Sequence, residues 1–175
     1  MATALRPRHQ LLQLFGTTTT ASGDNATAFG LSTTASGKQT TAFGSSTTAS
    51  GDNATAFGEN STASGEAATA FGIGSTASGK NSLAALGGTA SAENAAAIGN
   101  SAQATLADSV ALGSNSKTTR AKYRDLTVEA EKAAYGKGTT FTGSAWEATD
   151  NAIAVGNDST TTRQITGVAA GSLDT

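Results

Sequence analysis

The sequence predicts an all-β fold, a parallel β-roll solenoid built from coils of fourteen residues. Glycine recurs at every seventh position from Gly16 to Gly79. Phe precedes every second one of these glycines and Ser precedes the others, so the repeating unit has fourteen residues in two similar halves. A repeat this regular is typical of stacked architectures in which each unit packs only against its neighbours.

A single unit shows how one coil would fold. Residues 54–57 read Ala-Thr-Ala-Phe and residues 61–64 read Ser-Thr-Ala-Ser, and Gly and a two-residue turn follow each run, Glu-Asn after the first and Glu-Ala after the second. Because side chains alternate along a strand, Thr and Phe share one face of the first run, and Thr and Ser share one face of the second. Ala then faces the other way in both. Coils stacked about 4.8 Å apart would form two parallel sheets back to back, with alanine between them.

The Phe residues predict a face that is buried against another copy or another partner. On this alternation they form a ladder outside the roll, and a soluble monomer rarely exposes such an apolar patch. The opposite arrangement, with Phe inside the roll and Ala outside, stays open at this point. After Gly79 the pattern drifts, because residues 83–87 carry one extra residue, and Leu86 is assigned to the Phe position. The predicted seam comprises Phe29, Phe43, Phe57, Phe71, Leu86, Ile98, Leu112 and Val155.

The Thr-x-Ser runs predict the opposite, solvent-facing surface. A regular array of hydroxyls offers many shallow contacts, which several copies could combine into avidity. The same array could order water, so an ice-binding solenoid is an alternative function. The candidate ligand residues on this face are Thr34, Ser36, Thr48, Ser50, Thr62 and Ser64.

Charged residues follow the glycines of the Ser-containing halves. Adjacent coils place them within pairing reach, and most neighbours have opposite sign. Exposed pairs of this kind contribute roughly 0–1 kcal/mol each. The ladder consists of Asp24, Lys38, Asp52, Glu66 and Lys80.

The chain divides at the points where the repeat starts and stops. Residues 1–14 are expected to be a leader or a disordered start, and residues 15–113 hold the roll. Residues 114–150 form an insertion of different composition, and residues 151–159 return to the coil pattern. The insertion either contacts the ligand or forms a small core of its own, and if it alone binds, the repeats act as a spacer that presents it. Its aromatic candidates are Tyr123, Tyr135 and Trp146.

Two motifs carry a resemblance to a known family. Residues 109–113 (Ser-Val-Ala-Leu-Gly) and 152–156 (Ala-Ile-Ala-Val-Gly) resemble the S-V-A-I-G head repeats of YadA-like trimeric autotransporter adhesins. Residues 163–171 (Arg-Gln-Ile-Thr-Gly-Val-Ala-Ala-Gly) resemble the neck motif of that family, R-Q-I-T-N-V-A-A-G. Gly167 replaces the usual Asn of the neck, and Phe replaces the usual Ile in the early coils.

The resemblance implies a left-handed parallel β-roll, a homotrimer and a non-catalytic adhesin. It implies that residues 160–175 form a neck leading to a stalk and a membrane anchor that this chain lacks, on the outer membrane of a Gram-negative cell. The partners it implies are other copies of the chain, host matrix proteins such as collagen, fibronectin or laminin, host cells, and other bacteria. The implied neck residues are Arg163, Gln164, Ile165 and Val168.

Composition argues against several other classes of protein. The chain has no Cys, and its one His, His9, lies outside the repeats, so neither a thiolate metal site nor a nucleophile–His pair is expected. A net charge of −2 gives no basic footprint for nucleic acid. No stretch is apolar enough to span a membrane. No enzyme activity, metal or cofactor is therefore expected.

Overall fold

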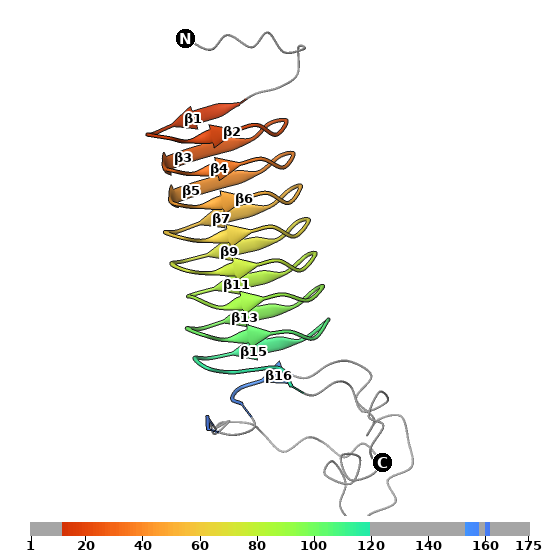
Figure 1. The fold of residues 1–175 in the computed structure, drawn as a ribbon. Helices are drawn as coiled ribbons and strands as arrows, with labels where there is room; N and C mark the ends of the chain where they lie inside the picture. The colour runs from red at the N-terminus through yellow and green to blue at the C-terminus, as the bar shows by residue number, and fades with distance from the viewer. Residues whose placement is uncertain (1–11, 120–152, 158–159, 162–175) are drawn as a thin grey trace, which may run out of the picture.

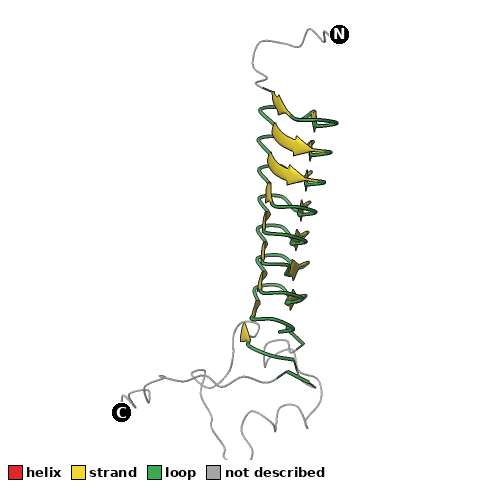
Figure 2. Cartoon of the chain, turned by 90° about the vertical axis from the view of Figure 1, so that its left-hand side faces the viewer, coloured by secondary structure: helices red, strands yellow, loops and turns green. Residues whose placement is uncertain are grey.

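The computed structural model describes residues 12–119, 153–157 and 160–161, and these form a stack of short coils. Figure 1 shows the coils rising as a single column, with each coil contributing one strand to each of two sheets. Turned by 90°, the column is narrow, and the strands lie on its two sides (Figure 2). The predicted all-β parallel solenoid is confirmed.

Both sheets are parallel throughout, and neighbouring strands are generally one coil apart in the sequence. Thr41 pairs with Thr55 and Phe43 with Phe57, which is the predicted spacing of fourteen. The nine strands of sheet A are, in order, β1 (Gln13–Phe15), β3 (Thr27–Leu31), β5 (Thr41–Ser45), β7 (Thr55–Phe57), β9 (Thr69–Phe71), β11 (Leu83–Ala85), β13 (Ala96–Ile98), β15 (Val110–Leu112) and β16 (Ile153–Ala154). The seven strands of sheet B are β2 (Thr20–Ala21), β4 (Thr34–Ala35), β6 (Thr48–Ala49), β8 (Thr62–Ala63), β10 (Thr76–Ala77), β12 (Thr89–Ala90) and β14 (Gln103–Ala104).

Alanine fills the space between the sheets. From β3 to β15 the inward-facing alanines of both sheets are completely buried, for example Ala56 in β7 and Ala63 in β8. Phe57, the residue after Ala56 in the same strand, is exposed on the outside. The alternative that Phe fills the roll while Ala faces outward is therefore wrong. Only a side chain as small as Ala allows two sheets to approach this closely.

Buried hydroxyls line the two edges of the alanine core, a feature that the sequence reasoning missed. They stand at the end of many of the turns, just before the next strand begins, and each donates to a backbone carbonyl in a turn or at the end of a strand. Thr33 Oγ1 donates to the Gly44 carbonyl at 2.7 Å, and Ser82 Oγ donates to the Gly79 carbonyl at 2.7 Å. Such bonds satisfy carbonyl groups that a tight turn would otherwise leave buried without a partner. The buried Ser and Thr residues include Thr33, Thr40, Thr47, Ser61, Ser75, Ser82, Ser109 and Ser116.

We expect Thr33→Val to lower the free energy of unfolding by about 1–2 kcal/mol, because the Gly44 carbonyl loses its buried donor while the side-chain volume stays the same. The adjacent Thr34→Val is the matched control. Thr34 points outward from sheet B, and its substitution should change stability by less than about 0.5 kcal/mol. Chemical denaturation of both variants measures the difference, and equal effects would show that the buried hydroxyls do not stabilise the roll.

The two kinds of glycine are required for different reasons. Gly30 follows Phe and has φ +137°, a conformation that other residues rarely adopt. Gly51 follows Ser and lies outside that region of φ, but a Cβ added to it would lie 2.0 Å from the Gly65 carbonyl oxygen of the next coil. Close approach between coils therefore requires glycine at Gly51, whereas Gly30 combines such an approach with a backbone conformation that favours glycine.

The prediction that Leu86 occupies the Phe position is wrong. Ala85, not Leu86, aligns with Phe71 on one side and with Ile98 on the other. Leu86 lies in the following turn with φ 57°, and its backbone N–H donates to the Phe71 carbonyl. The irregularity is thus a turn that is one residue shorter, because Thr76 pairs with Thr89, thirteen residues later.

The roll also extends further than the repeat pattern indicated. It begins at Gln13, which pairs with Thr27, so residues 13 and 14 belong to the first coil rather than to a leader. Residues 114–118 continue the last full coil, since Lys117 bridges Gln103. The chain returns at Ile153, which pairs directly with Val110. The described residues on either side of positions 120–152 therefore belong to two successive coils of the roll.

Candidate interaction surfaces

The outer face of sheet A carries the exposed Phe ladder. Phe15, Phe29, Phe43, Phe57 and Phe71 are between 40% and 61% exposed. The rings of Phe29 and Phe43 stack with centroids 4.6 Å apart and planes 3° apart, and the next two ring pairs stack at 4.9 and 5.4 Å. The rings form a ridge along the roll, and this apolar ridge is the feature from which the sequence predicted a seam.

A second column runs beside the Phe ladder on the same face. In the early coils it is polar, with Thr27, Thr41, Thr55 and Thr69 aligned by the strand register. From β11 onward the same column is apolar, with Leu83, Ala96, Val110 and Ile153. The Phe column meanwhile continues as Ala85, Ile98 and Leu112, and Val155 comes next after β16. The apolar part of sheet A is therefore one column wide in the first coils and two columns wide in the last.

The outer face of sheet B carries the predicted hydroxyl rows. Thr34, Thr48 and Thr62 lie in register at half-exposed positions, while Ser36, Ser50 and Ser64 are exposed. Among the described residues, the side chains of these six form no hydrogen bond to another protein group, in contrast to the buried hydroxyls at the edges of the core. The face from β4 to β12 bears no charge among its Thr-Ala-Ser runs. It is a neutral surface whose hydroxyls are available to a ligand.

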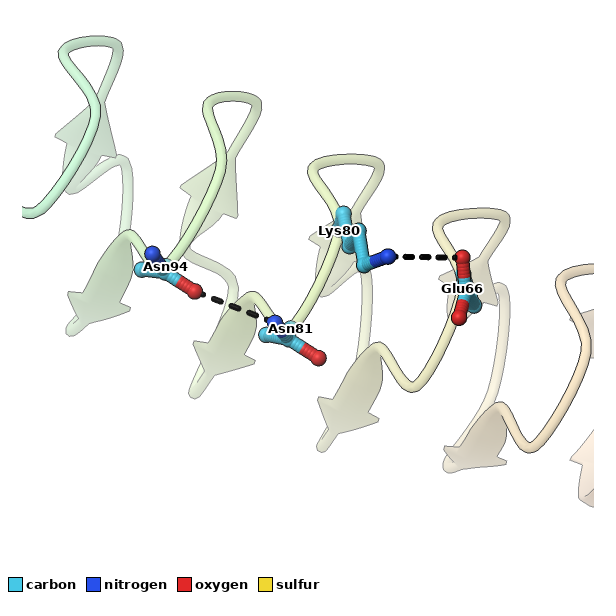
Figure 3. A network of polar contacts seen from close by, with 4 residues as sticks. All are labelled: Glu66, Lys80, Asn81 and Asn94. Atoms are coloured by element: carbon cyan, nitrogen blue, oxygen red, sulfur yellow. Dashed lines mark hydrogen bonds and ion pairs between the residues drawn. The ribbon is translucent and has the colours of Figure 1, made fainter.

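Polar ladders run along the edge that follows the Ser-containing halves (Figure 3). The Lys80 Nζ lies 3.1 Å from a Glu66 carboxylate oxygen, which confirms one predicted ion pair of the charge ladder. One position later, Asn81 Nδ2 donates to Asn94 Oδ1 at 3.1 Å, and Asn94 Nδ2 donates to Asp108 Oδ1 at 2.8 Å. These contacts link adjacent coils outside the core and help to fix their register.

We expect the ion pair between Glu66 and Lys80 to contribute no more than about 0.5 kcal/mol, because both side chains are about half exposed and solvent screens them. A double-mutant cycle with Glu66→Gln and Lys80→Met measures the coupling through chemical denaturation. The coupling should disappear in about 1 M salt. A coupling several times larger would show that the edge ladder is a principal source of stability.

Several predicted site residues lie outside the described part of the chain. These are the insertion aromatics and the neck residues, namely Tyr123, Tyr135, Trp146, Arg163, Gln164, Ile165 and Val168. The sequence analysis placed Thr and Phe on the same face of the first run, and the strand register confirms this, but it assigned the threonine column no role.

The described residues show neither a metal-binding cluster nor a membrane-spanning helix. They contain no cluster of three or more His, Cys, Asp or Glu side chains placed to hold a metal ion. Within the same ranges, no helix has the length and apolar character needed to cross a membrane.

Comparison with known proteins places the chain in a family. The profile described as the YadA head domain repeat matches residues 15–33, 35–61, 63–85 and 90–116, which together make up more than half of the chain. The crystal structure of the collagen-binding domain of the Yersinia adhesin YadA is similar, with a TM-score of 0.58 and 26% identity over 89% of this chain and 79% of that chain. A search of the curated proteins finds no match. The repeat, the parallel roll and these matches show that the chain belongs to the YadA-like head family of trimeric autotransporter adhesins.

Proposed function

We propose that this chain is the head of a homotrimeric, non-catalytic adhesin on the surface of a Gram-negative cell. The head attaches the cell to extracellular matrix, and its main ligand there is collagen. The neutral hydroxyl face of sheet B is the observation that carries the proposal. Its Thr and Ser side chains recur in successive coils from β4 to β12, and they have no hydrogen-bond partner among the described residues. The similar Yersinia domain is described as collagen-binding.

The two outer faces of the roll fit different roles in such a head. The Phe ladder of sheet A is an apolar ridge that a free chain would leave in water, and burial against copies of itself removes it. Sheet B then points outward on every copy. A symmetric assembly multiplies the weak contacts of each hydroxyl row, so the head gains avidity without a deep pocket.

A binding assay with the purified head tests the ligand. Immobilised triple-helical collagen peptide should retain the assembled head, and heat-denatured collagen should retain it less. Substituting Thr48 and Thr62 with Asp places charge in the centre of the hydroxyl face and should reduce binding at least about tenfold. A matched double substitution of the edge residues Asp52 and Glu66 with Ala should leave binding unchanged. Failure of the unmodified trimer to bind would contradict collagen as the ligand.

A second variant separates the roll from the insertion. The structure shows that residues 114–118 belong to the roll, so the excision should spare them. Residues 120–152 can be replaced by a copy of residues 51–54, which restores the spacing that joins Ser50 to Thr55 in an earlier coil. Retained collagen binding would assign adhesion to the roll. Lost binding by a folded trimer would assign it to the insertion and make the roll a spacer.

A further inference from the structure

We infer that the outer face of sheet A joins copies of this chain through two different seams in series. From Leu83 to Val155 the seam is dry and two columns wide. From Thr27 to Phe71 only the Phe ridge makes dry contact, and the threonine column beside it lines a hydrated corridor between the subunits. The inference rests on the proposed homotrimer, and it concerns which residues close the interface and which stay wet.

The threonine column places polar side chains on the face that carries the apolar Phe ridge. Thr27, Thr41, Thr55 and Thr69 lie in register on the outside of sheet A, and their hydroxyls make no hydrogen bond within the part of the chain that the structure describes. A hydroxyl that enters a dry interface without a partner is strongly unfavourable. The roll itself satisfies the hydroxyls that it buries, as Thr33 and Ser82 show. Four successive unsatisfied threonines per chain would therefore be incompatible with a dry contact.

The neighbouring Phe ridge stands higher above sheet A than the threonine column does. In each of these strands Thr and Phe lie two positions apart and therefore on the same face. The Phe side chain is larger and extends further from the sheet. The stacked rings of Phe29 to Phe71 present a continuous crest. A second copy that rests on this crest is held away from the threonine column, which leaves room for water along the hydroxyls.

The residue types of both columns change at β11. There the pair Thr69/Phe71 is followed by Leu83/Ala85, so the large apolar side chain moves from the Phe column to the threonine column. The next strands carry Ala96/Ile98 and Val110/Leu112, and neither column has a hydroxyl. The ridge ends where the polar column ends. Both columns then offer apolar side chains of moderate size, which suits a close and dry contact.

Single cysteines test the inference directly, because the chain has no native Cys. Thr55→Cys reports on the proposed corridor, Val110→Cys on the dry seam, and Thr62→Cys on the outer face of sheet B. Each is treated, in the assembled head, with a small charged thiol reagent, and its rate is compared with that of the same variant in denaturant. We expect Thr55→Cys to react within about tenfold of Thr62→Cys, and Val110→Cys at least about a hundredfold more slowly.

A second pair of variants covers the case in which a cysteine disturbs assembly. Val110→Thr places a hydroxyl in the dry seam and should lower the temperature at which the trimer dissociates. Thr55→Val removes a hydroxyl that water already satisfies and should leave that temperature nearly unchanged. A marked rise for Thr55→Val would overturn the hydrated corridor.

The outcomes separate this inference from the proposed trimer. Sedimentation of the unmodified head as a monomer, with Val110→Cys fully reactive, would contradict the trimer itself. A trimer in which Thr55→Cys and Val110→Cys are equally protected would keep the proposed function but overturn the corridor, because the whole face would then be dry.

Discussion

Phe57→Asp is expected to convert the assembled head into monomers while the roll itself stays folded. Phe57 is 44% exposed in the single chain and stacks between Phe43 and Phe71 in the middle of the ridge. An unpaired carboxylate in that position would be buried by assembly, at a cost of several kcal/mol per chain. That cost corresponds to a loss of about a thousandfold or more in the association constant. Sedimentation velocity measures the assembly, and circular dichroism checks that the strands remain.

Thr62→Asp is the matched control for this prediction. It places the same charge on the outer face of sheet B, in the strand of the same coil that lies across the alanine core from β7. Assembly should be unaffected. If both variants remain trimeric, or if both dissociate, the assignment of sheet A as the interface is wrong.

Gly30→Ala is expected to lower the free energy of unfolding by about 3 kcal/mol or more, since two penalties coincide there. The backbone of Gly30 has φ +137°, which an alanine rarely adopts. An added Cβ would also lie 1.7 Å from the carbonyl oxygen of Gly44 in the next coil. Backbone atoms of a stacked coil cannot move aside singly, so the local register must distort. Thermal unfolding of the roll measures the loss.

Gly74→Ala carries the cost of a positive φ without the cost of a steric clash between coils. Gly74 has φ +68°, and a Cβ added there would meet no atom within 4 Å. Ala67 already adopts φ 54° in a turn of the same roll. The substitution should therefore cost only about 1 kcal/mol. A loss at Gly74 as large as that at Gly30 would show that backbone conformation, rather than contact between coils, sets the requirement for glycine.

The periodic part of the sequence predicted the fold well, because every coil repeats the same physical problem. Alternation in Thr-Ala-Phe places Ala inside and Phe outside, and the strands bear this out. The prediction failed where the period changed. A count of residues between glycines placed Leu86 in the Phe position, whereas the shortened turn leaves the strand in register and places Ala85 there. Hydrogen bonding between strands, and not the spacing of glycines, decides the alignment.

The buried hydroxyls show a second limit of pattern reading. Thr33 and Thr34 are adjacent and chemically identical, yet the first is buried and bonded to Gly44 while the second faces outward. Composition alone marks both as polar surface residues. Only the closure of the turn, which brings a carbonyl of the next coil within reach, distinguishes them. The two outer faces of the site followed from the sequence for the opposite reason, since alternation along a strand depends on no distant contact.

The alanine core has a consequence for how long this head can be. Every interior layer is nearly the same, so each coil fits above any other, and adding or deleting a coil requires no new packing between the sheets. Recombination between the repeated gene segments would then change the reach of the head in steps of about 4.8 Å, the spacing between neighbouring strands. The shortened coil around Leu86 breaks that equivalence. The number of coils can thus vary in the Phe-bearing part that precedes Leu83, while the coils from Leu83 onward keep a fixed arrangement.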